Sequence, residues 1–448
     1  MRGAVYWRQA VGYRIHMTMP GNSLFPFLFK LMVVNHMTPT ALSFRHMIGF
    51  MGNKHGGDTT LEMTILNPNT NNTIISFSVS PDTASGAGIA PYTGGLIYPG
   101  EMKTITLSPA LAVNGSVKCE KGIRIDSDHP TFVYGNNRQQ SHTSMDEFLS
   151  IPRRELGNLY YVITGKKRPQ LLVVGLYANT SLNITVRATS GASYQNESYL
   201  SGQTLYETMK EYDTIQIVSE KRHNDFTGTE IKSSKPVSVF SGSQFSESSH
   251  LAEQIPTVAK WGEHHVTAPP ADEFLYNTTI VAAFPNTLLN SSCLDGSEKL
   301  LTLAEAGSFL NMRPSNVTCL ISSTRPVLVS IAIYSYTADT SMTIIQPMKR
   351  VLGDLMFLAP ENVYCFNLVV VTYCNSSLTL DKESLGTMKV DGDSGICIGR
   401  ASIGTGIHTI RSSGHAFFIS GYIHGTKNIN SIAFPLVPNC DEVSIFLF

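Results

Sequence analysis

Few short stretches of this chain combine the residue types and the spacing of a catalytic or metal site. "DGDSG" at 391–395 contains the Gly-Asp-Ser-Gly string found around the nucleophile of trypsin-like enzymes, where backbone amides form an oxyanion hole. No histidine segment of the Ala-Ala-His-Cys type lies upstream. Its carboxylates could also hold calcium, but the glutamate that an EF-hand needs at its twelfth position is missing. We therefore predict an acidic turn.

Two further stretches also lack a complete site. "GEHH" brings His264 and His265 together, but neighbouring strand residues point to opposite faces and cannot easily hold one metal ion. "SGAGIAP" at 85–91 is half of a dinucleotide fingerprint, without the third glycine or a surrounding βαβ unit. We therefore predict no catalytic residue, no cofactor and no metal ligand.

The strands that would position any site are predicted from a short sequence pattern, called the phrase below, that recurs along the chain. "GIRIDSDHPTFVYG" at 122–135 returns as "IKSSKPVSVFSG", "LISSTRPVLVSI" and, more faintly, "TIRSSGHAFFISG". Apolar alternation on both sides of a serine-rich turn predicts a β-hairpin, with proline at the start of the second strand. When Pro130, Pro236, Pro326 and His415 are aligned, the spacings are 106, 90 and 89 residues. This period suits a whole small domain.

The residues around the phrase repeat as well. Each of the first three copies is followed by an apolar stretch ending in proline and then by a glycine, as in "FLSIPRRELG", "AEQIPTVAKWG" and "TIIQPMKRVLG". The fourth copy has "SIAFPLV" without the glycine. We predict an irregular N-terminal segment, four diverged repeats and a C-terminal end in the last of them, with the boundaries 1–43, 44–155, 156–260, 261–351 and 352–448.

Length and composition favour an all-β chain with several cores. The 448 residues exceed the usual limit of one hydrophobic core. Hydrophobic residues make up 42% and charged residues only 15%, as in β-rich extracellular modules. A repeat of roughly 90 residues fits a two-sheet module, so we predict tandem β-sandwich-like repeats. The alternative is a propeller-like closed array with two blades per repeat.

Charge and hydropathy limit the partners. The formal net charge of -1 leaves no general attraction for nucleic acid, and we predict none as a partner. The basic stretch "GKKRPQ" at 165–170 is interpreted as a solvated loop. No run of eighteen apolar residues occurs, so no transmembrane span is predicted.

Sequons indicate the compartment. Every predicted repeat carries at least one Asn-x-Ser/Thr motif, which favours an extracellular, secreted or cell-surface protein. The candidate N-glycosylation sites are Asn71, Asn114, Asn179, Asn183, Asn196, Asn277, Asn290, Asn316 and Asn375.

The seven cysteines fit an oxidising compartment. Cys293 and Cys319 in the third repeat occupy places comparable to those of Cys374 and Cys397 in the fourth, which predicts one equivalent disulfide in each. Other pairings stay open, because Cys365 could reach Cys374 or Cys440, and Cys119 has no obvious partner.

The stretches "SMDEFLSIPRRELGNLYYVIT" and "SGSQFSESSHLAEQIPTVAKWG", together with the opening phrase, resemble the N-terminal domain of the IgGFc-binding protein family. The likeness covers roughly residues 44–440, although the cysteines that relatives often have before the His-Leu-x-Glu-Gln segment are absent. It implies a secreted or cell-surface protein of mucus or matrix that binds and does not catalyse. The residues that carry it are Ser127, Pro130, Pro236, His250, Glu253, Gln254, Pro256, Trp261 and Gly262.

Two classes of function follow. We predict a non-enzymatic extracellular binding or adhesion module that interacts with a glycoprotein, mucus, matrix or microbial ligand, so that the partner is an extracellular protein or glycan. The alternative is a secreted hydrolase whose site is dispersed along the chain.

Overall fold

The structure is a computed structural model whose described residues all belong to one compact unit. It describes residues 44–53, 59–87, 92–139, 144–219, 221, 223–246, 249–334, 340–352, 354–361, 365–390, 395–412, 416–427 and 430–437. The predicted N-terminal segment 1–43, residues 391–394 of the "DGDSG" turn, and His415 lie outside these ranges.

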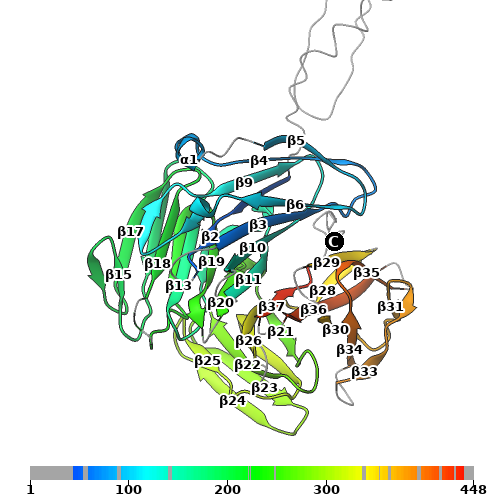
Figure 1. The fold of residues 1–448 in the computed structure, drawn as a ribbon. Coiled ribbons are helices and arrows are strands. Elements are labelled where there is room, and N and C mark those ends of the chain that lie inside the picture. The colour runs from blue at the N-terminus through cyan, green and yellow to red at the C-terminus, as the bar shows by residue number, and fades with distance from the viewer. Residues whose placement is uncertain are drawn as a thin grey trace, which may run out of the picture. The chain divides into compact units, whose positions relative to one another are not determined.

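Strands dominate the described residues (Figure 1). The helical elements among them are short: α1 (Pro81–Ala87) and the 3-10 turns η1 (Pro109–Leu111), η2 (Arg153–Glu155) and η3 (Val258–Lys260). The predicted all-β class is therefore confirmed. The boundaries of the four predicted repeats stay a prediction, and the strands are grouped below into four segments by residue number.

The first segment, residues 44–149, contains two four-stranded sheets. Its strands are β1 (Phe44–Ile48), β2 (Phe50–Met51), β3 (Thr59–Leu66), β4 (Thr73–Ser78), β5 (Tyr92–Ile97), β6 (Met102–Leu107), β7 (Ala112–Val113), β8 (Val117–Cys119), β9 (Ile123–Ser127), β10 (Phe132–Gln139) and β11 (Ser144–Leu149). The strand orders are β1-β9-β4-β5 and β11-β10-β3-β6. Ile125 of one sheet and Ile65 of the other lie in one buried cluster, as expected for sandwich-like packing.

The second segment, residues 157–254, is organised around one long strand, β19. Its strands are β12 (Gly157–Tyr161), β13 (Pro169–Gly175), β14 (Thr180–Thr185), β15 (Ala192–Tyr194), β16 (Glu197–Tyr199), β17 (Thr204–Met209), β18 (Thr214–Val218), β19 (Glu230–Ser246) and β20 (Ser249–Gln254). Residues up to Ser233 of β19 pair with β12 and β14, and residues from Val237 onward pair with β13 and β20. One strand thus serves two sets of partners.

The third segment repeats this plan, whereas the fourth is divided between two sheets without one long strand common to both among its described residues. The third has β21 (Gly262–Thr267), β22 (Leu275–Ala282), β23 (Thr287–Cys293), β24 (Glu298–Leu303), β25 (Phe309–Asn311), β26 (Cys319–Tyr334) and β27 (Ser341–Ile345). The fourth has β28 (Lys349–Leu352), β29 (Leu355–Ala359), β30 (Cys365–Tyr373), β31 (Leu378–Leu380), β32 (Glu383–Ser384), β33 (Thr387–Lys389), β34 (Ile396–Ile403), β35 (Gly406–Ser412), β36 (Ala416–Lys427) and β37 (Asn430–Pro435). Strand β26 plays the part of β19.

The repeated phrase does not form a hairpin, so that prediction was wrong. In the first segment β9 pairs with β1 and β4, whereas β10 pairs with β3 and β11. The phrase is a corner at which the chain leaves one sheet and enters the other. Pro130 and Pro236 lie at this corner, where the backbone makes no ladder hydrogen bond. Because no amide proton is needed there, proline costs the sheet no hydrogen bond. Alternation continues on both sides of such a bend, so it looks like a hairpin in sequence.

Hydrogen bonds explain why serine recurs at the corner. In three segments the serine hydroxyl donates to the carbonyl oxygen two residues later: Ser127 to His129 at 2.7 Å, Ser233 to Lys235 at 2.7 Å and Ser323 to Arg325 at 2.8 Å. The next side chain accepts from the backbone amide of a neighbouring strand: Asp128 from Ile74 at 2.8 Å, Ser234 from Ser181 at 2.9 Å and Thr324 from Leu288 at 3.0 Å. A short oxygen-bearing side chain suffices for each bond.

Two disulfides join strands within the third and fourth segments. Cys293 of β23 is bonded to Cys319 of β26, directly opposite it in the ladder. Cys374 is bonded to Cys397 of β34, so Cys374 is not the partner of Cys365. Cys119 is a half-buried free cysteine.

Removing the first disulfide is expected to destabilise the protein. A Cys293→Ala/Cys319→Ala double variant should lose about 3 kcal/mol of unfolding free energy, because a loop of 26 residues is no longer closed in the unfolded chain. Urea denaturation under non-reducing conditions measures this loss. Cys119→Ala, which breaks no crosslink, is the control, and equal midpoints for the two variants would contradict the prediction.

Candidate functional site

The last strands of the four segments meet in the interior. Strand β11 contacts β20 and β37, and β27 contacts the same two strands. We call this meeting of β11, β20, β27 and β37 the strand junction. Every side chain described in these strands is buried, yet many are polar, which is unusual for strands covered on both faces. The family-motif residues predicted from the sequence, His250, Glu253 and Gln254, all lie in β20.

Two buried carboxyl groups on neighbouring strands of the junction influence each other. Asp146 of β11 accepts hydrogen bonds from the backbone amides of Ala252 at 2.6 Å and Glu147 at 2.9 Å. Burial nevertheless raises the pKa of Asp146 well above its usual range. Burial, and then the neighbouring carboxylate of Asp146, raise the pKa of Glu253 in the same direction. Both groups therefore favour the protonated, neutral form inside the junction.

A third carboxyl group extends the cluster along β11. Burial raises the pKa of Glu147 to about 8, and the Glu62 carboxylate adds to the rise. The Asn136 side-chain amide donates to Glu147 Oε2 at 3.5 Å, which works in the opposite direction. Burial thus favours the neutral acid at Glu147 as well as at Asp146 and Glu253.

Histidines of the interior are neutral as well. Burial lowers the pKa of His250 to about 4 and that of His424 to about 3. The His424 Nε2 lies 2.9 Å from the hydroxyl of Ser431 in β37. Gln254 ties β20 to its surroundings, since its Oε1 accepts from the Ile151 amide at 2.7 Å and its Nε2 donates to Ser238. Side-chain hydrogen bonds therefore connect the strands of the junction to one another and to their surroundings.

The strand junction is closed to ligands. His250 and Glu253 are each only 1% exposed, so an external substrate cannot touch them. In the part of the chain that the structure describes, no group of three or more histidine, cysteine, aspartate or glutamate side chains could hold a metal ion. The polar residues that carry the family resemblance, His250, Glu253 and Gln254, therefore lie inside the fold.

A pocket opens at the corner of the first segment. This corner pocket is lined mainly by apolar groups and is partly open to solvent. Its lining residues are Phe44, His46, Pro130, Thr131, Phe132, Leu149, Ser150, Pro152, Arg154 and Val437. The His46 Nδ1 lies 3.0 Å from the Ser150 hydroxyl, and burial lowers the pKa of His46 to about 4. The Arg154 guanidinium lies over the Phe44 ring, 5.0 Å from its centroid.

The pocket lies at this corner because His46 is smaller than the tyrosine that occupies the matching position in the second segment. His46, Tyr160 and His265 occupy matching positions, because they face Ile125, Ile231 and Ile321, each five residues before a corner proline. In the second segment the longer Tyr160 fills the corner and donates its hydroxyl to the Val237 carbonyl at 2.8 Å. The shorter imidazole leaves space. A smaller pocket lies beside His265, next to the predicted family residues Trp261 and Pro256.

Other predicted residues have structural surroundings. The Trp261 indole N–H donates to the Pro256 carbonyl at 3.0 Å. A Cβ atom on Gly262 would lie 2.5 Å from Pro347, so only glycine fits there without a shift. His264 is exposed whereas His265 is buried, which confirms that the two imidazoles point to opposite faces. Sequence reasoning missed His46, although aligning "FRHMI" with "NLYYV" and "EHHVT" would have singled it out.

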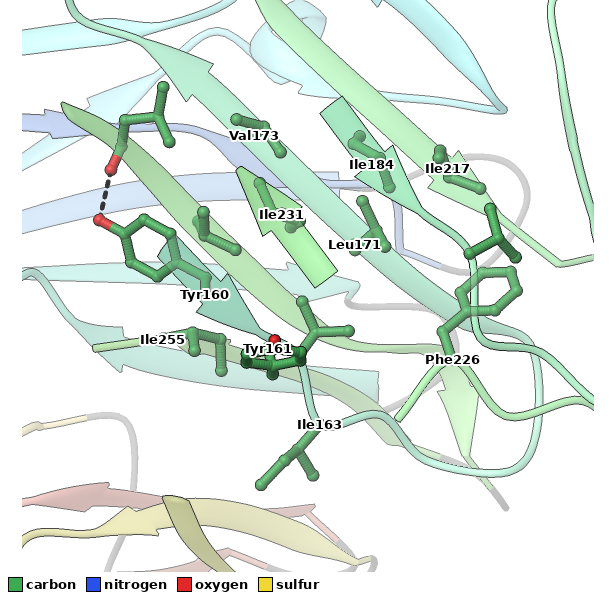
Figure 2. Close-up of a cluster of buried hydrophobic side chains, with 14 of the residues drawn as sticks. Tyr160, Tyr161, Ile163, Leu171, Val173, Ile184, Ile217, Phe226, Ile231 and Ile255 are labelled. Atoms are coloured by element: carbon green, nitrogen blue, oxygen red, sulfur yellow. Dashed lines mark hydrogen bonds between the residues drawn. The ribbon is translucent and has the colours of Figure 1, made fainter. Parts of the chain in front are cut away.

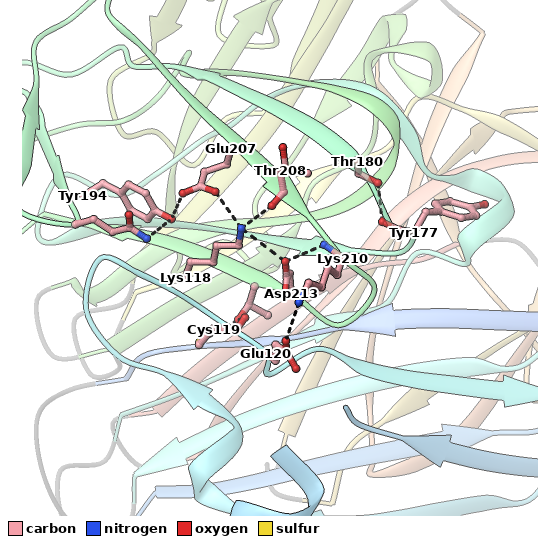
Figure 3. A network of polar contacts seen from close by, with 12 residues as sticks. Lys118, Cys119, Glu120, Tyr177, Thr180, Tyr194, Glu207, Thr208, Lys210 and Asp213 are labelled. Carbon is pink, nitrogen blue, oxygen red and sulfur yellow. Dashed lines mark hydrogen bonds and ion pairs between the residues drawn. The ribbon is translucent and has the colours of Figure 1, made fainter. Parts of the chain in front are cut away.

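A polar network links the first and second segments (Figure 3). Strand β8 pairs with β18, and Lys118 of β8 reaches Glu207 at 3.0 Å and Asp213 at 3.8 Å. The Tyr194 hydroxyl donates to the other oxygen of Glu207 at 3.0 Å. Since both carboxylates are paired with this lysine, the network is a structural tie between the segments.

Sequons lie mostly on the surface. Eight of the nine predicted asparagines are exposed: Asn71, Asn114, Asn179, Asn183, Asn196, Asn290, Asn316 and Asn375. Asn277 is half-buried, and its side-chain amide donates to the Met312 carbonyl. An amide engaged in this way is a poor glycan acceptor. Glycosylation at the other sites stays a prediction.

A family model described as IgGFc binding protein matches residues 146–422. The chain belongs to this family. The match runs from β11 to β36, so it includes the polar residues of β20 in the strand junction. Among curated proteins no individual match was found.

Membership of the IgGFc-binding family and the two disulfides indicate an extracellular module of the binding type. The resemblance drawn from the sequence is thereby confirmed. None of the helices in the described ranges has the length and hydropathy needed to cross a bilayer.

Proposed function

We propose that this chain is a non-enzymatic extracellular binding module whose partner is a protein or glycoprotein. The observation that carries this proposal is the burial of the polar motif residues in the strand junction, where His250 and Glu253 are 1% exposed. Groups sealed in this way support a scaffold, whereas a hydrolase needs its acid, base or nucleophile within reach of the substrate. Binding is then left to the surface.

The corner pocket is the best anchor for such a partner. Binding energy in protein interfaces concentrates where one large side chain fills a desolvated pocket. Phe44, Phe132 and Leu149 offer an apolar lining of this kind, and the Arg154 guanidinium adds a positive group beside it. We infer that the partner inserts one apolar side chain and places a carboxylate or hydroxyl near Arg154.

Binding to two immobilised probes, an IgG Fc fragment and a purified mucin, tests the proposal by surface plasmon resonance. Val437→Trp places a large ring at the half-buried edge of the pocket and should weaken binding at least 10-fold with an unchanged melting temperature. Leu200→Trp, at an exposed apolar residue outside the pocket lining, is the matched control and should bind like the wild type.

Three outcomes oppose the proposal. Equal binding by the wild type and Val437→Trp would remove the corner pocket as the anchor. An absence of binding to both probes would exclude these two partners. Hydrolysis of either probe by the purified wild-type chain would support the hydrolase alternative instead.

A further inference from the structure

A glycan acceptor faces an exposed tyrosine on the second segment. Asn183 of β14 lies directly opposite Tyr206 of β17 in the antiparallel ladder. Opposite residues of such a pair point to the same face of the sheet, with Cβ atoms roughly 5 Å apart. Asn183 is exposed, and Tyr206 is 73% exposed. The sequon Asn183-Ile184-Thr185 therefore lies beside an uncovered aromatic ring.

The third segment has the same arrangement. Asn290 of β23 lies opposite Leu300 of β24, which is 69% exposed. Leu288, two residues before Asn290 and on the same face, is also exposed. The sequon is Asn290-Ser291-Ser292. A second acceptor thus has a large apolar neighbour that the protein itself does not cover.

The first segment provides the contrast. In the first segment, Ser76 is the residue equivalent to Asn183 and Asn290. Each of the three lies two residues after a residue whose backbone amide donates a hydrogen bond to a side chain at the corner, namely Ile74, Ser181 and Leu288. Ser76 begins no sequon, and the residue opposite it is the small Thr93. In the first segment both the acceptor and a large residue directly opposite it are therefore missing, although the neighbouring pair Ile74 and Leu96 is exposed.

Sequons elsewhere lack such partners. The exposed acceptors Asn71, Asn114, Asn179, Asn196, Asn316 and Asn375 lie outside the strands, in turns and connections. Asn179 shows how a turn alone explains a sequon, since its φ of 54° is in the left-handed region that asparagine tolerates. Only Asn183 and Asn290 combine exposure with a cross-strand partner among the described sequons.

We propose that N-linked glycans at Asn183 and Asn290 pack their first sugar on Tyr206 and Leu300 and so form part of the folded surface. The first N-acetylglucosamine presents a face of C–H groups, which gains dispersion contacts with an aromatic ring or a leucine side chain. The sugar covers apolar area that would otherwise face water or another molecule. This inference does not rest on the identity of the binding partner.

A double-variant cycle in secreted, glycosylated protein tests the contact at Asn183. Asn183→Gln and Tyr206→Thr should each lower the melting temperature by about 1 °C, because losing one contact shifts the melting temperature less in a chain of this size than in a small domain. The double variant should lose no more than either single variant, because both remove one contact. When the folded wild type and the folded Tyr206→Thr variant are both treated with N-glycanase, their melting temperatures should be nearly equal. Asn290→Gln with Leu300→Thr forms the parallel cycle.

Chemical accessibility gives a second readout. Tyr206 should react at least 5-fold faster with tetranitromethane after the glycans are removed, as mapped on its peptide. Asn196→Gln is the control, because this exposed turn acceptor has no cross-strand partner and should leave the Tyr206 reactivity unchanged. Additive losses in the cycle, an unchanged nitration rate, or peptides that show Asn183 and Asn290 unmodified would each overturn the proposal.

Discussion

Replacing Tyr160 with alanine is expected to lower the free energy of unfolding by about 4 kcal/mol. The ring is fully buried among apolar side chains of the second segment, including Ile231 and Ile255 (Figure 2), and truncation of a buried aromatic side chain typically costs about 3–5 kcal/mol. Its hydroxyl also accepts from the Gly157 amide at 2.8 Å and donates to the Val237 carbonyl at 2.8 Å. Tyr160 thus connects the start of β12 to the corner of β19.

Two further variants separate the contributions of ring and hydroxyl. Tyr160→Phe keeps the packing but leaves two buried backbone groups without this partner, so a loss of about 1–3 kcal/mol is expected. Tyr98→Ala removes an exposed ring and should change stability by no more than about 0.5 kcal/mol. Chemical denaturation of the three variants measures these differences. A Tyr160→Ala variant as stable as Tyr98→Ala would refute the structural role of the corner tyrosine.

The fold class was predictable because strand alternation is a local signal. Ile123 and Ile125 alternate with polar residues in the sequence, and both are buried in β9. The difference between a hairpin and a corner was not predictable in the same way. Both have alternation, a short polar turn and a proline such as Pro130, and they differ only in which distant strands pair with each half.

The candidate site was only partly predictable for a related reason. The motif around His250 and Glu253 identified the family, but its burial depends on β11, β27 and β37, which are distant in sequence. The corner pocket depends on the length of one side chain, His46 in place of a tyrosine, opposite Ile125. Neither feature has a signature within a short stretch, whereas the disulfides Cys293–Cys319 and Cys374–Cys397 follow from matching places in two repeats.

The buried ionisable groups act on stability in two opposite senses. Four histidines have a pKa of about 3–4 in the folded protein, namely His46, His250, His265 and His424. An unfolded histidine titrates near pH 6.5, so the stability from these neutral rings is present above that pH and is lost as the pH falls toward 4 and 3. The buried carboxyl groups work the other way, because their folded pKa values are raised. Their contribution is present below about pH 4.5 and is lost as the pH rises through the folded pKa.

Replacing Glu253 with glutamine isolates one of these carboxyl groups. Glutamine resembles the protonated acid and cannot ionise, so the variant should be close to the wild type in stability at pH 5. Above pH 5 the unfolded wild-type chain loses this proton more readily than the folded protein, because burial and the Asp146 carboxylate raise the pKa of Glu253 in the folded state. The wild type should therefore lose stability relative to the variant as the pH rises from 5 to 8, so that the variant becomes the more stable protein.

Urea denaturation of both proteins from pH 5 to pH 8 measures this difference. Glu263→Gln, at an exposed carboxyl group outside the strand junction, is the matched control and should run parallel to the wild type. The titratable group that acts on Glu253 is Asp146. It remains in the variant, so the comparison reports the Glu253 proton and any relief of its repulsion with Asp146. Parallel profiles for wild type and Glu253→Gln would mean that Glu253 is ionised in the folded protein. Because no cation is paired with Glu253 among the described salt bridges, a protonated acid is the form that this junction can bury.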